Sequence, residues 1–276
     1  MKYVLMWAIA GVLLLSGCAV DHYQVPETVA KQQWLVEKPF KLTCGDHSFI
    51  TGKRFNGKIA GWSFKGKELF VKAGSTQLGT LYEAPFPKDK NAVYSIAVDG
   101  ITPDAITGDI TAREKIEITR QSDYGDLKIF AFYTLTPEGW SWSVKYRIVS
   151  EKHPARYFYL FTVPWNNKFI KFAYVDKGKL TQGRMSNSKK WRINSALDKL
   201  AMYAPELKVG VVTEVVGNLP TEIRHHTLWD LPYFHKYFLF HAKPEWKAGY
   251  ESPVYTLKFR AFEANEKDFI EKSNIK

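Results

Sequence analysis

The chain contains 276 residues, of which 45% are hydrophobic and 15% aromatic, and its net charge is +11. This length is enough for one large domain or two small ones. The presence of only two cysteines excludes a framework of internal disulfides. A basic, aromatic-rich composition indicates an anionic partner, although an excess of lysine can also serve only to keep the surface soluble.

The first residues show the order of segments found in export signals. Lys2 supplies a positive charge, residues 4–15 form an uncharged apolar run, and the sequence LSGC ends at Cys18. The apolar run is short for a membrane span. This arrangement resembles the bacterial lipoprotein signal, which is cleaved before the cysteine. The alternative is an ordinary secretory signal that happens to contain a cysteine.

The resemblance implies that residues 1–17 are removed and that Cys18 is lipidated, followed by a tether over residues 18–33. In Gram-negative lipoproteins an aspartate after the cysteine commonly signals inner-membrane retention, so Ala19 favours the outer membrane. We therefore expect a protein anchored to the outer membrane through Cys18 and facing the periplasm. Nucleic acid is not an expected partner there. The candidates are acidic polysaccharide, lipopolysaccharide or a phospholipid surface. Cys44 then lacks a disulfide partner, and we expect a buried thiol.

From residue 34 onward, short apolar segments alternate with turns rich in glycine and proline. We predict strands over residues 34–42, 69–73, 76–82, 92–98, 112–120, 156–163, 168–175, 208–216, 237–241 and 254–262. Residues 49–64 are also read as strand, with the glycines at 52, 57 and 61 marking strand ends or bulges. We predict loops over 83–91 and 100–108, and residues 178–194 form a basic, polar segment. Strand signals at intervals of about eight to twelve residues are typical of a sandwich or barrel. The sequence therefore predicts one all-β domain, a large antiparallel β-sandwich over residues 34–262. The tail at 263–276 is compatible with one helix.

The longest predicted pair of strands is a β-hairpin over residues 126–149. On its second arm, polar residues alternate with an apolar set: Trp140, Trp142, Val144, Tyr146 and Ile148. This is the period-two pattern of a strand with one apolar face. The first arm is apolar on both sides, and the sequence TPEG between the arms suits a tight turn. Arms of about ten residues indicate a large sheet, whose apolar face requires a second layer.

Three segments carry a resemblance to a known fold. Residues 54–64, RFNGKIAGWSF, are similar to the epimerase stretch R-[FY]-x-N-R-I-A-x-G-x-F. Residues 119–151 resemble the strand pair that precedes the first catalytic histidine of the epimerases, and residues 243–262 resemble their final strand after a turn rich in proline and glycine. In this order the segments look like the galactose mutarotase fold, a β-supersandwich shared by aldose epimerases and many carbohydrate-active enzymes.

The chain departs from the epimerase pattern where catalysis would occur. The Asn-Arg pair of the family is Gly57-Lys58 here, and residues 161–165 read FTVPW without the expected histidine. The epimerase mechanism needs a general acid and a general base on opposite sides of the reacting centre. The resemblance therefore implies the fold but not aldose epimerase activity, because a fold alone does not specify function.

Four of the seven histidines lie within residues 222–241, a stretch that is also dense in rings and charges. Such a stretch indicates a sugar site in which Arg224 holds a carboxylate with two hydrogen bonds. In a polysaccharide lyase, Tyr233, His226 or His235 would remove the proton alpha to a neutralised uronate carboxylate. The alternative is a structural segment whose histidines are partly buried and hydrogen-bonded.

Further sugar contacts are expected from rings that stack on pyranose faces and from polar groups that hold hydroxyls or carboxylates. The candidate substrate-binding residues are Trp165, Asn166, Trp229, Asp230, Lys190, Trp191, Arg192 and Trp246. The asparagines of residues 165–167 also suit an ordinary turn, and the basic cluster at 189–192 also suits a solvated loop. The sequence does not determine whether Trp165 and the histidine-rich stretch share one cleft.

Several motifs of known catalytic sites are absent from the sequence. It contains no G-x-S-x-G, no phosphate-binding glycine loop and no dinucleotide fingerprint, which excludes hydrolases with a nucleophile elbow, NTPases and dehydrogenases. No HxxxH or HExxH spacing occurs, so neither a metal nor another cofactor is expected. We expect an envelope lipoprotein that binds an acidic polysaccharide and, if it is an enzyme, processes it. A non-catalytic sugar-binding lipoprotein and a structural or assembly lipoprotein are the alternatives.

Overall fold

The computed structural model describes residues 24–71, 75–78, 92–152, 154, 158–195, 197–217, 225–241 and 246–275, without the side chains of residues 75–78, 158, 225, 226 and 236–241. Within these residues the regular secondary structure is almost entirely β-structure, arranged as a large antiparallel sheet with smaller sheets packed against it. No helix in this part of the chain is long and apolar enough to cross a membrane.

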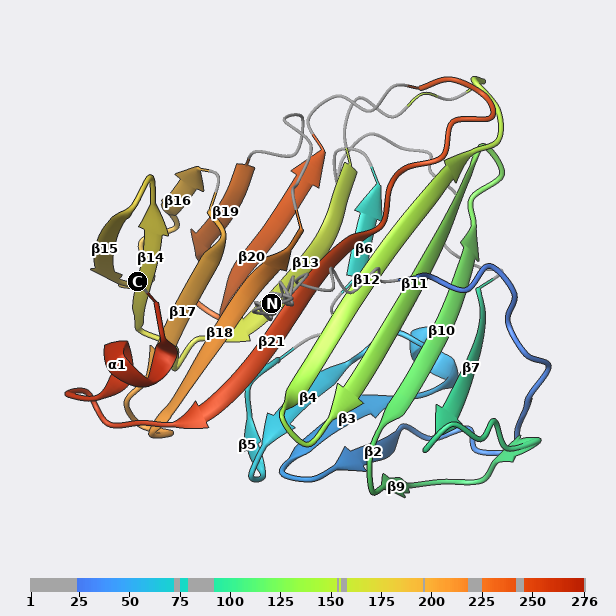
Figure 1. Ribbon diagram of the computed structural model, residues 1–276, viewed down its shortest axis with the longest axis horizontal. Helices are drawn as coiled ribbons and strands as arrows, with labels where there is room; N and C mark the ends of the chain where they lie inside the picture. The colour runs from blue at the N-terminus through green and yellow to red at the C-terminus, as the bar shows by residue number, and fades with distance from the viewer. Residues whose placement is uncertain are drawn as a thin grey trace, which may run out of the picture.

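A nine-stranded antiparallel sheet forms one layer of the sandwich (Figure 1). In spatial order its strands are β15 (Lys179–Arg184), β14 (Lys171–Asp176), β17 (Lys199–Ala204), β18 (Val209–Val216), β21 (Tyr255–Glu263), β12 (Gly139–Ile148), β11 (Leu127–Thr136), β10 (Ile116–Asp123) and β7 (Val93–Val98). The predicted hairpin forms β11 and β12, in which Leu127 pairs with Ile148 and Thr136 pairs with Gly139. The predicted turn is confirmed at Pro137 and Glu138.

Two five-stranded sheets form the second layer. The first contains β16 (Trp191–Ser195), β19 (His225–Asp230), β20 (Phe234–His241), β13 (Phe158–Asn166) and β6 (Ser75–Leu78). The second contains β5 (Lys67–Glu68), β4 (Gly61–Phe64), β3 (His47–Thr51), β2 (Phe40–Cys44) and β9 (Ile110–Ala112). The remaining elements are the pair β1 (Gln33–Trp34) and β8 (Ala105–Ile106), the short helix η1 (Lys53–Phe55) and the helix α1 (Phe269–Ser273). Both smaller sheets lie behind the large sheet in Figure 1.

Alternation along the strands sends apolar and polar side chains to opposite faces of the large sheet. Trp140 and Trp142 on β12 and Phe259 on β21 are at most 4% exposed and belong to the common core. Ser141 and Lys258, the intervening residues of the same strands, pair on the opposite face. We call the face toward the smaller sheets the inner face and the opposite one the outer face.

Aromatic rings join the two layers across the inner face. Trp140 stacks on Phe259 with ring centroids 4.0 Å apart. Trp62 of β4 meets Trp140 edge-on at 5.5 Å, and Phe161 of β13 meets Trp142 edge-on at 5.0 Å. Each such pair contributes about 0.5–1.5 kcal/mol beyond the burial of its area. Both smaller sheets are therefore fastened to the central hairpin by ring contacts.

The structure confirms the predicted fold class, and the strands predicted over residues 208–216 and 254–262 coincide with β18 and β21. The strand prediction misses β15 and β16, which lie within the basic, polar segment 178–194. Both are edge strands, whose exposed positions tolerate polar residues. β17 has no predicted counterpart, and the C-terminal helix is limited to the five residues of α1.

The strand predicted over residues 69–73 is also wrong over its described part, residues 69–71. Leu69 and Phe70 are fully buried, but only Phe70 forms an isolated bridge, to Trp165 of β13. Their apolar character reflects their position between β5 and the neighbouring sheet and not membership of a strand. The thiol of Cys44 is buried, as expected.

A buried histidine contributes to the core of the second layer. His47 on β3 is 1% exposed, and its Nδ1 accepts a hydrogen bond of 3.3 Å from Nε1 of Trp62. Burial lowers the pKa of His47 to about 4. The neutral ring is therefore the form that the fold accommodates.

We expect protonation of His47 to destabilise the fold. In the unfolded chain its pKa returns to about 6.5, so the unfolded chain binds the proton more tightly between pH 6.5 and pH 4. This contribution to the free energy of unfolding is complete above pH 6.5 and is lost as the pH falls toward 4. The difference between the two pKa values corresponds to on the order of 3 kcal/mol.

The substitution His47→Gln provides the measurement, since glutamine can still accept the hydrogen bond of Trp62 but does not titrate. Urea unfolding of the wild type and the variant is compared near neutral pH and near pH 4. We expect the free energy of unfolding of the wild type to exceed that of the variant near neutral pH and to lose this excess at the lower pH. An advantage of the same size at both pH values would contradict the role assigned to His47.

Candidate functional site

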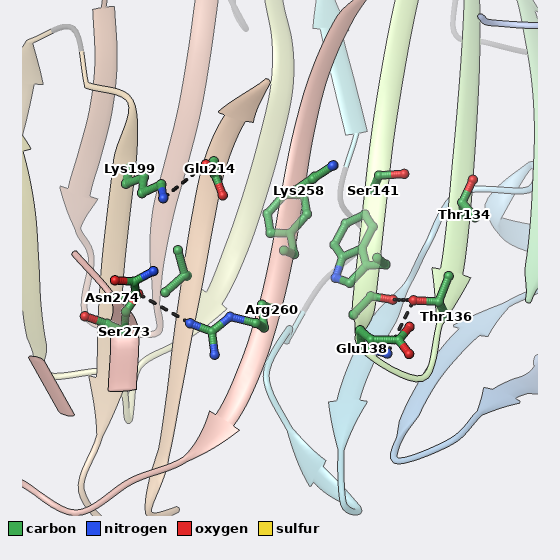
Figure 2. A pocket seen from close by; sticks show the side chains of 14 residues that line it. Thr134, Thr136, Glu138, Ser141, Lys199, Glu214, Lys258, Arg260, Ser273 and Asn274 are labelled. Carbon is green, nitrogen blue, oxygen red and sulfur yellow. Dashed lines mark hydrogen bonds and ion pairs between the residues drawn. The ribbon is translucent and has the colours of Figure 1, made fainter. Parts of the chain in front are cut away.

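A hollow of about 450 Å³ lies on the outer face of the nine-stranded sheet (Figure 2). Its floor contains a row of polar side chains that are neighbours across five strands. In strand order these are Thr134 on β11, Ser141 on β12, Lys258 on β21, Glu214 on β18 and Lys199 on β17. Because neighbouring strands lie about 4.8 Å apart, the row extends about 19 Å across the sheet.

Two segments border the hollow at its sides. On one side α1 packs on β17 and β18, and Nη2 of Arg260 donates to the carbonyl oxygens of Lys272 at 3.0 Å and Ser273 at 3.3 Å. Figure 2 shows Arg260 directed toward Ser273 and Asn274, with Glu138 of the hairpin turn on the other side. The C-terminal segment and the turn between β11 and β12 therefore define the width of the hollow.

The lining of the hollow combines hydroxyl groups with charges of both signs. Three cations, Lys199, Lys258 and Arg260, and two carboxylates, Glu138 and Glu214, leave a formal charge of +1. Nζ of Lys199 lies 3.2 Å from the carboxylate of Glu214. The volume falls within the range of about 300–1,000 Å³ that is usual for small-molecule sites. This lining suits a polyhydroxylated ligand that carries negative charge. None of its residues is a histidine.

A second group of ionisable side chains lies on the inner face near the β7 edge of the large sheet. Arg120 on β10 is 3% exposed, and its Nε donates to the carbonyl oxygen of Asn56 at 2.7 Å. Burial and the proximity of Arg120 lower the pKa of Lys58 to about 8, and burial raises the pKa of Tyr133 to about 12. Lys58 occupies the position of the arginine in the epimerase pattern. Perturbed pKa values accompany functional sites and buried structural networks alike.

Asp230, a predicted substrate-binding residue, is the centre of a buried hydrogen-bond network. It is fully buried, and its carboxylate accepts from the backbone N–H groups of Ser186 and Asn187, both at 2.9 Å. It also accepts from Nε and Nη2 of Arg192, at 2.9 and 2.7 Å. Burial alone would raise the pKa of Asp230, but the hydrogen bonds from Ser186, Arg192 and Ser188 outweigh it and lower the pKa to about 2.

The burial of Asp230 corrects the prediction that it holds sugar groups, whereas the side chain of Arg192 is 25% exposed and its contact with sugar stays a prediction. The carboxylate uses both of its oxygens within the protein, and the guanidinium also donates to the hydroxyls of Ser186 and Ser188. The pair instead anchors the loop between β15 and β16 to the end of β19. A buried carboxylate requires partners of this kind because its desolvation is costly.

The structure describes the side chains of two candidate catalytic residues, Tyr233 and His235, and they differ in exposure. Tyr233 lies in the turn between β19 and β20 and is 82% exposed, whereas His235 on β20 is fully buried. Burial lowers the pKa of His235, which favours its neutral form. Of these two alternative bases, Tyr233 is therefore accessible to a ligand and His235 is not, and the catalytic role of Tyr233 stays a prediction. Arg224 lies outside the described residues, as does the side chain of His226, and their roles stay predictions.

Trp165 and Asn166 at the end of β13 belong to the core and to a turn. Trp165 is fully buried, so the prediction that its ring forms a sugar platform is wrong. Nδ2 of Asn166 donates to the carbonyl oxygen of Glu68 at 3.1 Å, and its Oδ1 accepts from the N–H of Lys168 at 3.0 Å, as the turn interpretation requires. Trp165 pairs with His235 across β13 and β20, but both side chains lie in the core and not in a cleft.

Trp191 and Trp229, by contrast, remain at the surface. They pair across β16 and β19, where Trp191 is 54% exposed and Trp229 is half-buried. Nε1 of Trp229 donates to the carbonyl oxygen of Lys189 at 3.0 Å, and Lys190 is exposed beside them. Trp246 is half-buried against the core, and its Nε1 donates to a main-chain carbonyl at 3.1 Å. No group of three potential metal ligands is found among the described residues.

The sequence did not predict the residues of the hollow, because its densest group of histidines, rings and charges lies elsewhere, within residues 222–241. The only available signal was the polar side of the alternating strands, on which Ser141 and Lys258 are found. This signal does not show which strands are neighbours, and Lys199, Glu214 and Lys258 come from three separate strands.

No protein-family model matches the chain, and no curated protein matches it. Solved structures do resemble it. A galactose mutarotase related enzyme from Lactobacillus acidophilus superposes with a TM-score of 0.50 at 8% identity, covering 83% of this chain and 99% of that one. The chain has the galactose mutarotase-like fold. At this identity the likeness establishes the fold alone.

Two glycosidases contain a similar region. An alpha-N-acetylgalactosaminidase from Bifidobacterium bifidum gives a TM-score of 0.54 at 7% identity, over 85% of this chain and 37% of the enzyme. An alpha-galactosidase from Geobacillus stearothermophilus, solved in complex with stachyose, gives a TM-score of 0.51 at 8% identity, over 83% of this chain and 41% of the enzyme. The galactose mutarotase-like fold thus corresponds to less than half of each of these longer enzymes.

We expect the substitution Asp230→Asn to lower the free energy of unfolding by about 2–4 kcal/mol, because it leaves a partly buried guanidinium without its counter-charge. Asp198→Asn is the matched control, since Asp198 is exposed and should change stability little. Urea unfolding of both variants provides the measurement. Equal stability of the two variants would show that the network does not anchor the loop.

Proposed function

We propose that the protein binds an acidic saccharide in the hollow on the outer face. The observation that carries this proposal is the lining itself, in which hydroxyl groups, three cations and two carboxylates surround about 450 Å³ of space. Sugar hydroxyls can donate to the carboxylates and accept from the cations, while an acidic group on the sugar is favoured by the net positive charge. The galactose mutarotase-like fold, which two glycosidases also contain, is consistent with a carbohydrate ligand.

We infer a location in the cell envelope from the signal-like sequence that ends at Cys18, and the course of the N-terminal segment would turn the outer face toward the membrane. Val25 is buried, and Glu27 pairs with Lys145 at 2.5 Å and with Arg147 at 2.7 Å on the outer face of β12. Cys18 precedes Gln24 by six residues, which span about 20 Å when fully extended. In this proposal a lipid on Cys18 holds the protein at the outer membrane, facing the periplasm.

The first experiment uses soluble protein that begins after Cys18. A panel of acidic and neutral polysaccharides and their oligosaccharides is tested for binding and for released products in the same wells. We expect binding to acidic members. New reducing or unsaturated ends would show that the protein also processes its ligand, and binding to none of the panel would contradict the proposal.

We expect Lys258→Ala to weaken binding of the acidic saccharide about tenfold, the typical loss when one hydrogen bond to a charged group is removed. Lys258 is exposed, so the fold should tolerate the change. Lys41→Ala is the matched control, because Lys41 is an exposed lysine on β2, outside the hollow. Equal affinities of the two variants, measured by calorimetry, would exclude the hollow as the binding site.

The anchor is tested by Cys18→Ser in the full-length chain. We expect this variant to remain unprocessed and to incorporate no labelled acyl chain, since the cysteine sulfur is the point of lipid attachment. Cys44→Ser is the control and should be processed and labelled normally. Normal processing and labelling of the Cys18 variant would refute the lipoprotein assignment.

A further inference from the structure

A pair of tryptophans at the edge of a five-stranded sheet has no part in the hollow. Trp191 lies on the edge strand β16 and is 54% exposed, although tryptophan is usually largely buried. Its cross-strand neighbour is Trp229 on β19. The pairing shifts register between Trp191 and Ile193. Such bulges redirect side chains and are frequent beside binding sites.

The loop before Trp191 is held in one conformation by the Asp230 network. Asn187 and Lys189 adopt left-handed backbone conformations, with φ of 56° and 58°, which are unfavourable for lysine in particular. The N–H of Lys189 donates to the carbonyl oxygen of Asp230 at 2.9 Å, and the N–H of Asp230 donates to that of Lys190 at 3.0 Å. The hydrogen bond from Trp229 to the same loop fixes the second ring. The surface is therefore organised before any ligand arrives.

The charges around the rings indicate the chemistry of the ligand. Lys189 and Lys190 are exposed next to Trp191, so the rings are bordered by positive charge. An apolar protein partner would bury these ammonium groups without counter-charges, which is unfavourable. A saccharide can stack the C–H face of its ring on the indole of Trp191 and place an acidic substituent near the lysines.

We propose that Trp191, Trp229 and the adjoining Lys190 form a second binding surface for acidic saccharides. This surface takes the same class of ligand as the proposed function, but its residues are not those of the hollow. β16 and β19 belong to the layer that packs against the inner face of the large sheet, whereas the hollow opens on the outer face. A short oligosaccharide therefore occupies one site at a time, and a single molecule of protein binds two oligosaccharides.

The test is calorimetric titration of the soluble protein with the uronate oligosaccharide of the panel that binds best. We expect two binding sites in the wild type. Trp191→Ala should weaken one of them about tenfold, the usual effect of removing one well-placed aromatic contact. Trp191→Phe should recover part of the loss. Leu35→Ala is the control, because Leu35 is an exposed apolar residue elsewhere, at 65%.

The outcomes separate this proposal from the proposed function. Loss of one site in Lys258→Ala and of the other in Trp191→Ala supports both. An effect of Trp191→Ala alone retains the second surface and rejects the hollow, and an effect of Lys258→Ala alone overturns the second surface. If Trp191→Ala reduces binding to anionic phospholipid vesicles but not to the oligosaccharide, the rings contact a membrane and the proposal is wrong. Absence of any saccharide binding in the wild type overturns both proposals.

Discussion

The stacking of Trp140 on Phe259 is the contact on which the rest of the structure depends. It joins β12, from the middle of the chain, to β21 near its end, and so places the final strand in the centre of the large sheet. Trp62 packs against the same pair from the second layer. Because close-packed rings tolerate little displacement, this cluster determines the register of the central strands as well as the distance between the layers.

The same register creates the hollow. A strand that directs one side chain inward directs its neighbour outward, so the positions of Trp140 and Phe259 in the core place Ser141 and Lys258 side by side on the outer face. Glu214 is brought next to Lys258 by the pairing of β18 with β21. The proposed sugar site is therefore a consequence of the core packing, and a slip of one residue in β21 would remove it.

The Asp230 network shows why residue types alone were a poor guide to the site. An aspartate and an arginine near several aromatic rings have the composition of a sugar site. Here Asp230 and Arg192 form hydrogen bonds with each other, because a carboxylate in the core must be fully hydrogen-bonded. Their contribution is indirect, since they hold the loop that presents Trp191 to solvent.

The sequence by itself determined the local architecture, because alternation and turn chemistry act over a few residues. The hairpin of β11 and β12 was predicted from the alternation around Trp140 and Trp142, and the strand β21 from the alternation within residues 254–262. Their resemblance to the galactose mutarotase fold identified the architecture that the structure shows. Only the tertiary structure decided which residues meet. The hollow combines side chains from five strands. Trp165 and Trp191 were both predicted to contact sugar, but Trp165 is fully buried and Trp191 is 54% exposed. Pairing between distant strands is set by the packing of the whole core, and no local pattern encodes it.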